Sequence, residues 1–250
     1  MAKKENVNDV NDIVAFDLPS GIPVEIQEVT AAAEKMLLNR QDMKTGKGLN
    51  KFILRALVSY DGKPMPTGSD GMNTLLDMKS GDRNYLILRI RMNSYGEELD
   101  FNYKCPVCGK TSGYHINFQE ALDNGILKVY PYRDDMPIVV NARSGIAEID
   151  YMTGRDEEWL ATQKEIDLIN IAVAGCSAFN GHKPTYKEFE DLLVKDLSKI
   201  RLEILNLKGG LDPKIELECP NPDCNNNYDV MLYQIPDFFT PLTAKGITGA

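Results

Sequence analysis

Four of the five cysteines form two separated pairs, and this spacing constrains the fold more than any other feature of the chain. The pairs are Cys105-Pro-Val-Cys108 and Cys219-Pro-Asn-Pro-Asp-Cys224. Two such pairs can supply the four thiolates of a tetrahedral zinc site. The sequence therefore predicts a structural zinc ion bound by Cys105, Cys108, Cys219 and Cys224. Buried free thiols and a disulfide are the alternatives that the spacing leaves open.

Each cysteine pair lies between two segments in which apolar and polar residues alternate, and a period of two is typical of a half-buried strand. Around the first pair the apolar positions are Leu99, Phe101, Tyr103, Tyr114, Ile116 and Phe118, and around the second they are Ile215, Leu217, Tyr228, Val230 and Leu232. Each pair is therefore expected at the tip of a β-hairpin. Gly109, directly after Cys108, can adopt a left-handed backbone conformation that turns amides toward the sulfurs.

The separation of the two pairs is about 110 residues, far more than in a compact zinc ribbon. Each doubling of loop length adds only about 0.6 kcal/mol to the free energy of closure, so this loop costs on the order of 2 kcal/mol more than a short one. A structural zinc ion contributes roughly 10–16 kcal/mol at neutral pH. The free energy of metal binding therefore exceeds the free-energy cost of loop closure. The difference is larger if the intervening segment folds on itself.

The amino-terminal segment lacks the apolar run of a signal peptide. The longest apolar runs are short, such as 85–88, and none approaches the roughly 20 residues of a membrane span. We therefore expect a protein made and kept in a reducing cytosol, where paired cysteines favour metal over a disulfide. The fifth cysteine, Cys176, lies in an apolar stretch and is interpreted as a small core residue.

The two histidines are not assigned as metal ligands. His115 is close to the first pair, but the alternation places it on the opposite strand face from Tyr114 and Ile116. His182 lies in a Gly-His-Lys-Pro loop and is expected to be solvated.

The charge of the chain bears on its partners. Zinc-binding hairpins often belong to nucleic-acid-binding proteins, which usually carry a basic face. A net charge of −9 and an isoelectric point near 4.9 disfavour such a partner. The local basic groups have acidic neighbours in helical patterns and are interpreted as solvated faces; they are Arg89 and Arg91, and Lys195, Lys199 and Arg201. A zinc-ribbon protein that binds nucleic acid or assists transcription remains the alternative function.

We predict an α+β fold in which two zinc-knuckle β-hairpins form one four-cysteine site, with a helical insertion between them. The predicted regions are a flexible amino-terminal tail, 1–12; an α+β region, 13–100; a zinc-knuckle module, 101–118 plus 211–235; a strand-and-loop region, 119–152; the helical insertion, 153–210; and a carboxy-terminal docking segment and tail, 236–250. Helices are expected at Ala31–Asn39 and Asp82–Ser94, whereas the apolar segment 51–59 is compatible with either strand or helix.

The sequence carries no recognisable catalytic motif. Neither histidine has a plausible partner for a nucleophile relay, and there is no glycine-rich motif for phosphates or dinucleotides. Four cysteine ligands would also close the coordination shell of zinc, whereas a catalytic zinc keeps a position for water. We therefore predict that the protein is not an enzyme.

The order of several motifs resembles that of a known family. These motifs are Leu18-Pro19-Ser20-Gly21 before a short strand and an Ala/Glu/Leu helix; Gly81-Asp82-Arg83 leading to Leu86, Arg89 and Arg91; Ser94-Tyr95-Gly96 before the first cysteine pair; Gly209-Gly210-Leu211 before the second; and Phe238-Phe239-x-Pro241. Over residues 16–241 the chain resembles the baseplate hub subunit or hub assembly chaperone family of contractile-tailed, T-even-like bacteriophages, with relatives in phage-tail-like injection systems. The second cysteine pair departs from this pattern, because four residues intervene where the family pattern has two.

The resemblance implies a non-enzymatic role in building the central hub of the tail baseplate. The implied partners are other tail hub, baseplate or tape-measure proteins, and the implied location is the host cytoplasm during assembly, with retention in the virion baseplate left open. Docking surfaces are expected at Phe16 and Leu18 and at Phe238 and Phe239, unless these side chains pack in the core. A rubredoxin-like iron site for electron transfer is a further alternative, because ligand identity alone does not separate zinc from iron.

Overall fold

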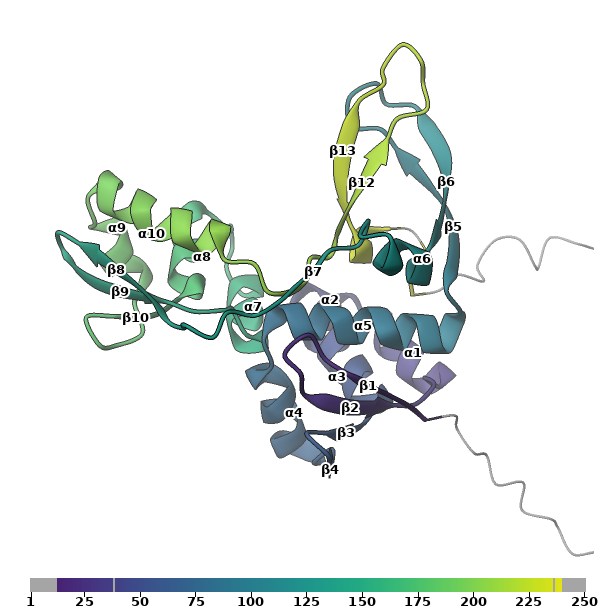
Figure 1. Ribbon diagram of the computed structural model, residues 1–250, viewed down its shortest axis with the longest axis horizontal. Helices are drawn as coiled ribbons and strands as arrows, with labels where there is room; N and C mark the ends of the chain where they lie inside the picture. The colour runs from purple at the N-terminus through teal and green to yellow at the C-terminus, as the bar shows by residue number, and fades with distance from the viewer. Residues whose placement is uncertain (1–12, 38, 236, 240–250) are drawn as a thin grey trace, which may run out of the picture.

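The computed structural model describes residues 13–37, 39–235 and 237–239. Figure 1 shows a body from which two parts project, a hairpin arm and a helical lobe. The amino-terminal tail expected at 1–12 lies outside the described residues, as do residues 236 and 240–250 of the expected carboxy-terminal docking segment. The mixed α+β class that the sequence predicts is confirmed, with small antiparallel sheets throughout.

The body is built around helix α5 (Ser80–Tyr95), which the sequence predicts over Asp82–Ser94. Its central apolar run is enclosed by the surrounding elements, and Gly96, with φ of 86°, ends it by donating its N–H to the Met92 carbonyl. Around it lie a four-stranded antiparallel sheet in the order β1 (Val14–Asp17), β2 (Pro23–Ile26), β3 (Leu57–Tyr60), β4 (Lys63–Pro64), and the helices α1 (Ala31–Leu37), α2 (Arg40–Lys44), α3 (Lys47–Ala56) and α4 (Gly68–Asp77).

The ambiguous apolar segment 51–59 proves to be both helix and strand. Helix α3 buries Phe52, Ile53 and Ala56 at helical spacing, and strand β3 then buries Leu57 and Ser59 at a spacing of two. The change of period at Leu57 explains why a single period fits the whole segment poorly. The helix expected at Ala31–Asn39 is shorter than predicted and is followed by the separate helix α2.

The helical lobe has a hydrophobic core of its own, separate from that of the body. It contains helices α7 (Gly154–Ala161), α8 (Leu168–Gly175), α9 (Tyr186–Glu190) and α10 (Val194–Asn206), and a sheet in the order β10 (Cys176–Phe179), β9 (Gly145–Ile149), β8 (Ile138–Ala142). The helices expected within 153–210 therefore share their core with strands from the preceding region. Val140 and Ala147 belong to the same buried cluster as Val173 of α8.

The arm consists of two hairpins whose bases belong to the core of the body. The first is β5 (Glu98–Lys104) and β6 (Thr111–Asn117), followed by α6 (Phe118–Asp123); the second is β12 (Lys214–Glu218) and β13 (Asn227–Met231), followed by a short 3-10 helix, η1 (Leu232–Gln234). Leu99, Phe101, Ile215 and Val230 are buried in the main cluster. The apolar residues of the alternating segments therefore face the core, and both predicted hairpins are confirmed.

The chain leaves the body for the helical lobe and returns along one narrow neck. Strand β7 (Val129–Tyr130) pairs antiparallel with β11 (Gly210–Leu211), so the two ends of the lobe lie side by side. At the neck the chain crosses the amino-terminal end of α5 at very close range. A Cβ atom added to Gly81 would overlap the Gly209 carbonyl oxygen and lie 2.7 Å from the Gly210 Cα.

A buried arginine joins the body to the helical lobe. Arg83, 4 % exposed, donates to the Asn50 side chain at 2.6 Å, to the Leu75 carbonyl at 3.1 Å and to Glu157 of α7 at 3.1 Å. Asn50 in turn donates to Glu158 at 3.1 Å. Because a buried guanidinium is costly to leave without partners, these bonds fix the position of α7 against the body.

A second buried arginine corrects an expectation from the sequence. Arg91 is 0 % exposed and does not lie on a solvated face. It donates to the carbonyls of Gly96, Glu98 and Phe238, and it forms no ion pair with a described residue. Burial lowers the pKa of Arg91 to about 10, which still leaves the group charged at neutral pH.

The aromatic residues expected as docking surfaces pack inward instead. Phe238 is 1 % exposed and meets Phe118 edge to face at 5.7 Å. Phe239 is partly buried and contacts the buried ring of Phe52. Leu18 is buried and Phe16 packs partly against the core. These side chains hold the ends of the described chain to the body and are not free to act as docking surfaces.

Gly81→Ala is expected to destabilise the protein by about 3 kcal/mol, because the added methyl group meets backbone that cannot rotate away. For a chain of this size that corresponds to a fall in melting temperature of roughly 6–12 °C, measurable by differential scanning fluorimetry. Gly113→Ala is the matched control, since its Cβ would lie an ordinary 3.5 Å from the Asn102 side-chain oxygen. Equal melting temperatures for the two variants would contradict the close crossing.

Candidate metal centre

The first cysteine pair lies in the turn between β5 and β6. The Cys105 N–H donates to the Lys110 carbonyl at 2.9 Å, and the Gly109 N–H donates to the Cys105 carbonyl at 3.0 Å. Gly109 has φ of 72°, the left-handed conformation that its position after Cys108 predicts. This tight turn brings both sulfurs of the pair to the same side of the hairpin tip.

The second pair forms a similar turn between β12 and β13, in spite of its two additional residues. The Cys219 N–H donates to the Asn226 carbonyl at 3.0 Å, and the Cys224 N–H donates to the Asn221 carbonyl at 2.8 Å. Asn225, directly after Cys224, has φ of 44° and so matches Gly109 of the first turn. The sequence analysis did not single out Asn225, although asparagine is among the few residues that readily adopt this conformation.

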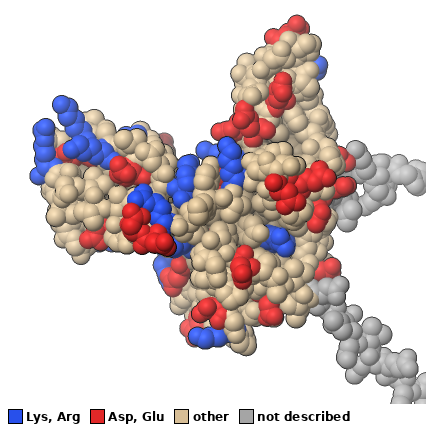
Figure 2. Space-filling model, in the orientation of Figure 1, with Lys and Arg blue, Asp and Glu red and all other residues tan. Residues whose placement is uncertain are grey.

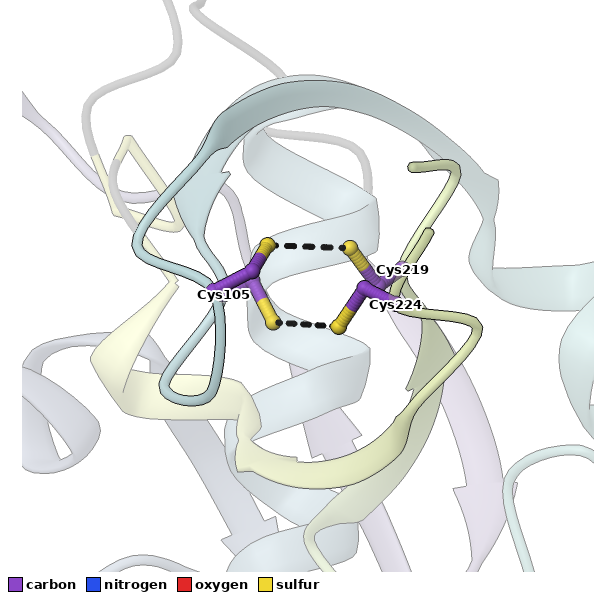
Figure 3. Close-up of side chains that lie close together, drawn as sticks. Cys105, Cys219 and Cys224 are labelled. Carbon is purple, nitrogen blue, oxygen red and sulfur yellow. Dashed lines mark hydrogen bonds between the residues drawn. The ribbon is translucent and has the colours of Figure 1, made fainter. Parts of the chain in front are cut away.

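The four sulfurs converge between the two hairpin tips, all within 4.8 Å of one another. Cys105 Sγ lies 3.9 Å from Cys224 Sγ, and Cys108 Sγ lies 3.7 Å from Cys219 Sγ. Figure 3 shows the sulfurs of the labelled cysteines pointing toward one another across the gap. Sulfurs bound at about 2.3 Å around a tetrahedral ion lie about 3.8 Å apart, so these distances fit a four-thiolate metal site.

The cluster is closed on one side and open on the other. Cys105 and Cys219 are buried, Cys224 is half-buried and Cys108 is exposed at the end of the arm. None of the five cysteines forms a disulfide, and Cys176 is buried in the helical lobe, as predicted. His115 lies on the outer face of β6 beside Asp100, and His182 is exposed beside Glu188 in the helical lobe.

The pKa values of the thiols differ across the cluster. A backbone hydrogen bond from Lys110 lowers the pKa of Cys108 to about 6. A backbone hydrogen bond from Asn221 acts in the same direction on Cys219, but desolvation and the neighbouring cysteines outweigh it and raise the pKa of Cys219 to about 12. One thiolate therefore forms readily and opposes further negative charge beside it. A divalent cation among the sulfurs would remove that opposition.

Below the cysteines an aromatic layer connects the two hairpins. The Tyr114 and Tyr228 hydroxyl groups are hydrogen-bonded at 2.7 Å, and Tyr114 also donates to the Glu218 carbonyl at 3.2 Å. Tyr103 stacks against Tyr228 across the same gap, with ring centroids 6.0 Å apart. The hairpins form two separate two-stranded sheets, so no shared ladder of backbone hydrogen bonds aligns their tips. The tyrosine contacts help to align them instead.

Comparison with known proteins gives a match to a protein family model. A family model described as T4 bacteriophage base plate protein matches residues 11–240. No curated protein and no solved structure shows a significant match. The matched range covers the body, the helical lobe and both hairpins, and it includes all four clustered cysteines. None of the helices in the described part of the chain has the length and apolarity needed to cross a bilayer.

Cys108→Ser is expected to abolish stoichiometric metal binding, because one of the four converging sulfurs is lost. We also expect a lower melting temperature and protease cleavage confined to the arm, since the core of the helical lobe does not include the hairpins. Plasma mass spectrometry of purified protein and mapping of proteolytic fragments measure both. Cys176→Ser is the control and should retain its metal. Normal metal content and melting of Cys108→Ser would show that the four cysteines are not a metal site.

Proposed function

The chain belongs to the T4 bacteriophage base plate protein family, and we propose that it is a non-enzymatic component of the tail baseplate hub, or a chaperone for hub assembly, stabilised by a structural zinc ion. The observation that carries this proposal is the family match over residues 11–240, which extends through every part of the described fold. The proposed partners are other tail hub, baseplate or tape-measure proteins. The proposed setting is the host cytoplasm during assembly, with or without later retention in the virion.

Zinc is proposed because the donor set and its spacing suit it. The two inter-hairpin sulfur distances of 3.7 and 3.9 Å bracket the edge of about 3.8 Å expected for four thiolates around tetrahedral zinc. Four protein ligands leave no position for water, which favours a structural ion over a catalytic one. The proposed ligands are Cys105, Cys108, Cys219 and Cys224, and the ion would neutralise charge that the sulfurs cannot carry together.

A bound metal ion would make the arm more rigid. A two-stranded hairpin is marginally stable by itself. At their bases the two hairpins are supported by the core of the body, and toward their tips the aromatic layer and the cysteines join them. A zinc ion at the end of the arm would make a rigid projection from two hairpins that are distant in the chain. A rigid projection presents a docking surface at a lower cost in conformational entropy than a flexible one.

Metal analysis of the purified protein is expected to give one zinc ion per chain and no visible absorption. The same ligands suit iron, so the measurement has to identify the element directly. Plasma mass spectrometry combined with a visible spectrum serves this purpose, on protein produced with both metals in the medium. A red protein with stoichiometric iron would replace the structural-zinc proposal with a rubredoxin-like one.

Affinity purification of the tagged chain from its producing cells, at moderate salt, is expected to recover tail hub, baseplate or tape-measure proteins. Mass spectrometry identifies them, and a tagged acidic protein of similar size controls for non-specific capture. Detection of the chain in finished particles would assign it as a component, and its absence from them as a chaperone.

Recovery of polymerase subunits or of nuclease-sensitive nucleic acid instead would contradict the hub proposal. Nucleic-acid binding would also weaken steeply with added salt, because phosphate contacts release counterions. That result would favour the zinc-ribbon alternative.

A further inference from the structure

Exposed apolar side chains are concentrated on the helical lobe. Of the thirteen large apolar residues that are exposed in the described part of the chain, nine lie between Val139 and Leu205. Helix α10 and the residue before it carry four of them, with exposed fractions of 55 % for Leu193, 80 % for Val194, 55 % for Leu202 and 59 % for Leu205. Such a concentration on one element is typical of an interaction surface.

The same face of α10 is basic. Lys195 and Lys199 are exposed beside these apolar residues, and neither forms an ion pair with a described residue. Of the acidic residues of α10, Asp196 is buried and accepts a hydrogen bond from Ser144, whereas Glu203, one turn beyond Lys199, is half-buried and forms no ion pair with a described residue. Figure 2 shows Lys and Arg side chains gathered over this end of the helical lobe. We call Val194, Lys195, Lys199, Leu202 and Leu205 the α10 face.

An acidic surface with an apolar residue lies at the foot of the arm. The Phe118 N–H donates to the Glu97 carbonyl, so Glu97 and Glu98 lie beside the start of α6, which carries Glu120 and Asp123. The Leu127 N–H donates to the Ala121 carbonyl, which folds the exposed Ile126 back toward the helix. We call Glu97, Glu98, Glu120, Asp123 and Ile126 the α6 patch.

The α6 patch is exposed and has no cationic partner of its own. All four of its carboxylate side chains lie in exposed residues, and none forms an ion pair with a described residue. Figure 2 shows Asp and Glu side chains gathered over the region of α6. The α6 patch and the α10 face therefore carry opposite unpaired charges.

We propose that the α10 face of one copy of this chain docks on the α6 patch of a second copy. The two surfaces are complementary in charge; the α10 face also offers three exposed apolar side chains, and the α6 patch offers Ile126. Within one copy they lie in different projections on either side of the neck (Figure 1), so they do not satisfy each other. If the α10 faces of two copies met, Lys195 and Lys199 of one copy would lie near the same lysines of the other and repel them. Charge therefore favours a head-to-tail contact over a twofold one.

The size of the α10 face sets the strength of this contact. A helix of 13 residues is about 20 Å long, and its exposed face about 10 Å wide. Such a contact is smaller than the roughly 1,200 Å² buried in total by stable complexes, so it is weak and depends on protein concentration. A head-to-tail contact repeats from copy to copy and gives a ring or a filament. This inference stands on the surface itself and does not require the hub proposal.

Sedimentation velocity of the full chain tests the contact over a hundredfold range of concentration. We expect self-association in about 0.1 M sodium chloride that is lost in about 1 M, where the Debye length falls from about 10 to 3 Å. Lys195→Glu/Lys199→Glu and Glu120→Lys/Asp123→Lys should each weaken association about tenfold or more, since attraction becomes repulsion. The chain with all four substitutions should associate again, because its surfaces are complementary once more.

Lys44→Glu/Lys63→Glu is the matched control. These two lysines are exposed in the body and change the net charge by the same amount as the α10 substitutions. Self-association should survive in this variant, and circular dichroism should show that all variants are folded. The proposal is overturned by a wild-type chain that stays monomeric, by equal loss in the control, or by a four-substitution variant that fails to recover. It is also overturned if the monomeric chain uses the α10 face to bind vesicles of anionic lipid or a different baseplate protein.

Discussion

The two hairpins of the arm share no backbone-to-backbone hydrogen bond in the described part of the chain, so contacts made by side chains align them. Three levels of contact provide it: the main core at the base, the tyrosine layer in the middle, and the four converging sulfurs at the tip. At the tip the four sulfurs lie close together, and four thiolates side by side would repel one another unless a cation lay among them. The geometry of the arm and the metal site that we propose at its tip therefore depend on each other.

A narrow neck allows a whole lobe to be inserted between the two halves of the arm. The short β7–β11 ladder brings the two ends of the insertion together, so closing the cysteine site does not require ordering a long free loop. The lobe folds around its own core and meets the body through Arg83, which bonds to residues of α3, α4 and α7. The arm and the lobe therefore present separate surfaces on one body.

The two buried arginines show how the body holds its extensions. Arg83 connects it to the helical lobe, and Arg91 connects it to the start of the arm and to the Phe238 segment. Both guanidinium groups bond mainly to neutral oxygens, and Arg91 forms no ion pair with a described residue. Such groups are costly to bury, so their many hydrogen bonds are specific to this arrangement and would not form in a looser one.

The sequence by itself determined the hairpins, the convergence of the two cysteine pairs, the long helix of the body and the baseplate family. The structural features depend on local signals: a period of two around each pair, a glycine after Cys108, and helical spacing ended by Gly96. The family resemblance depends on the order of motifs along the chain. Only the tertiary structure decided that Arg91 and Phe238 are buried, that strands β8 and β9 join the helical lobe, and that Asn225 plays the part of Gly109. Whether a side chain is buried depends on which elements pack against it in space. A local sequence pattern does not identify those elements.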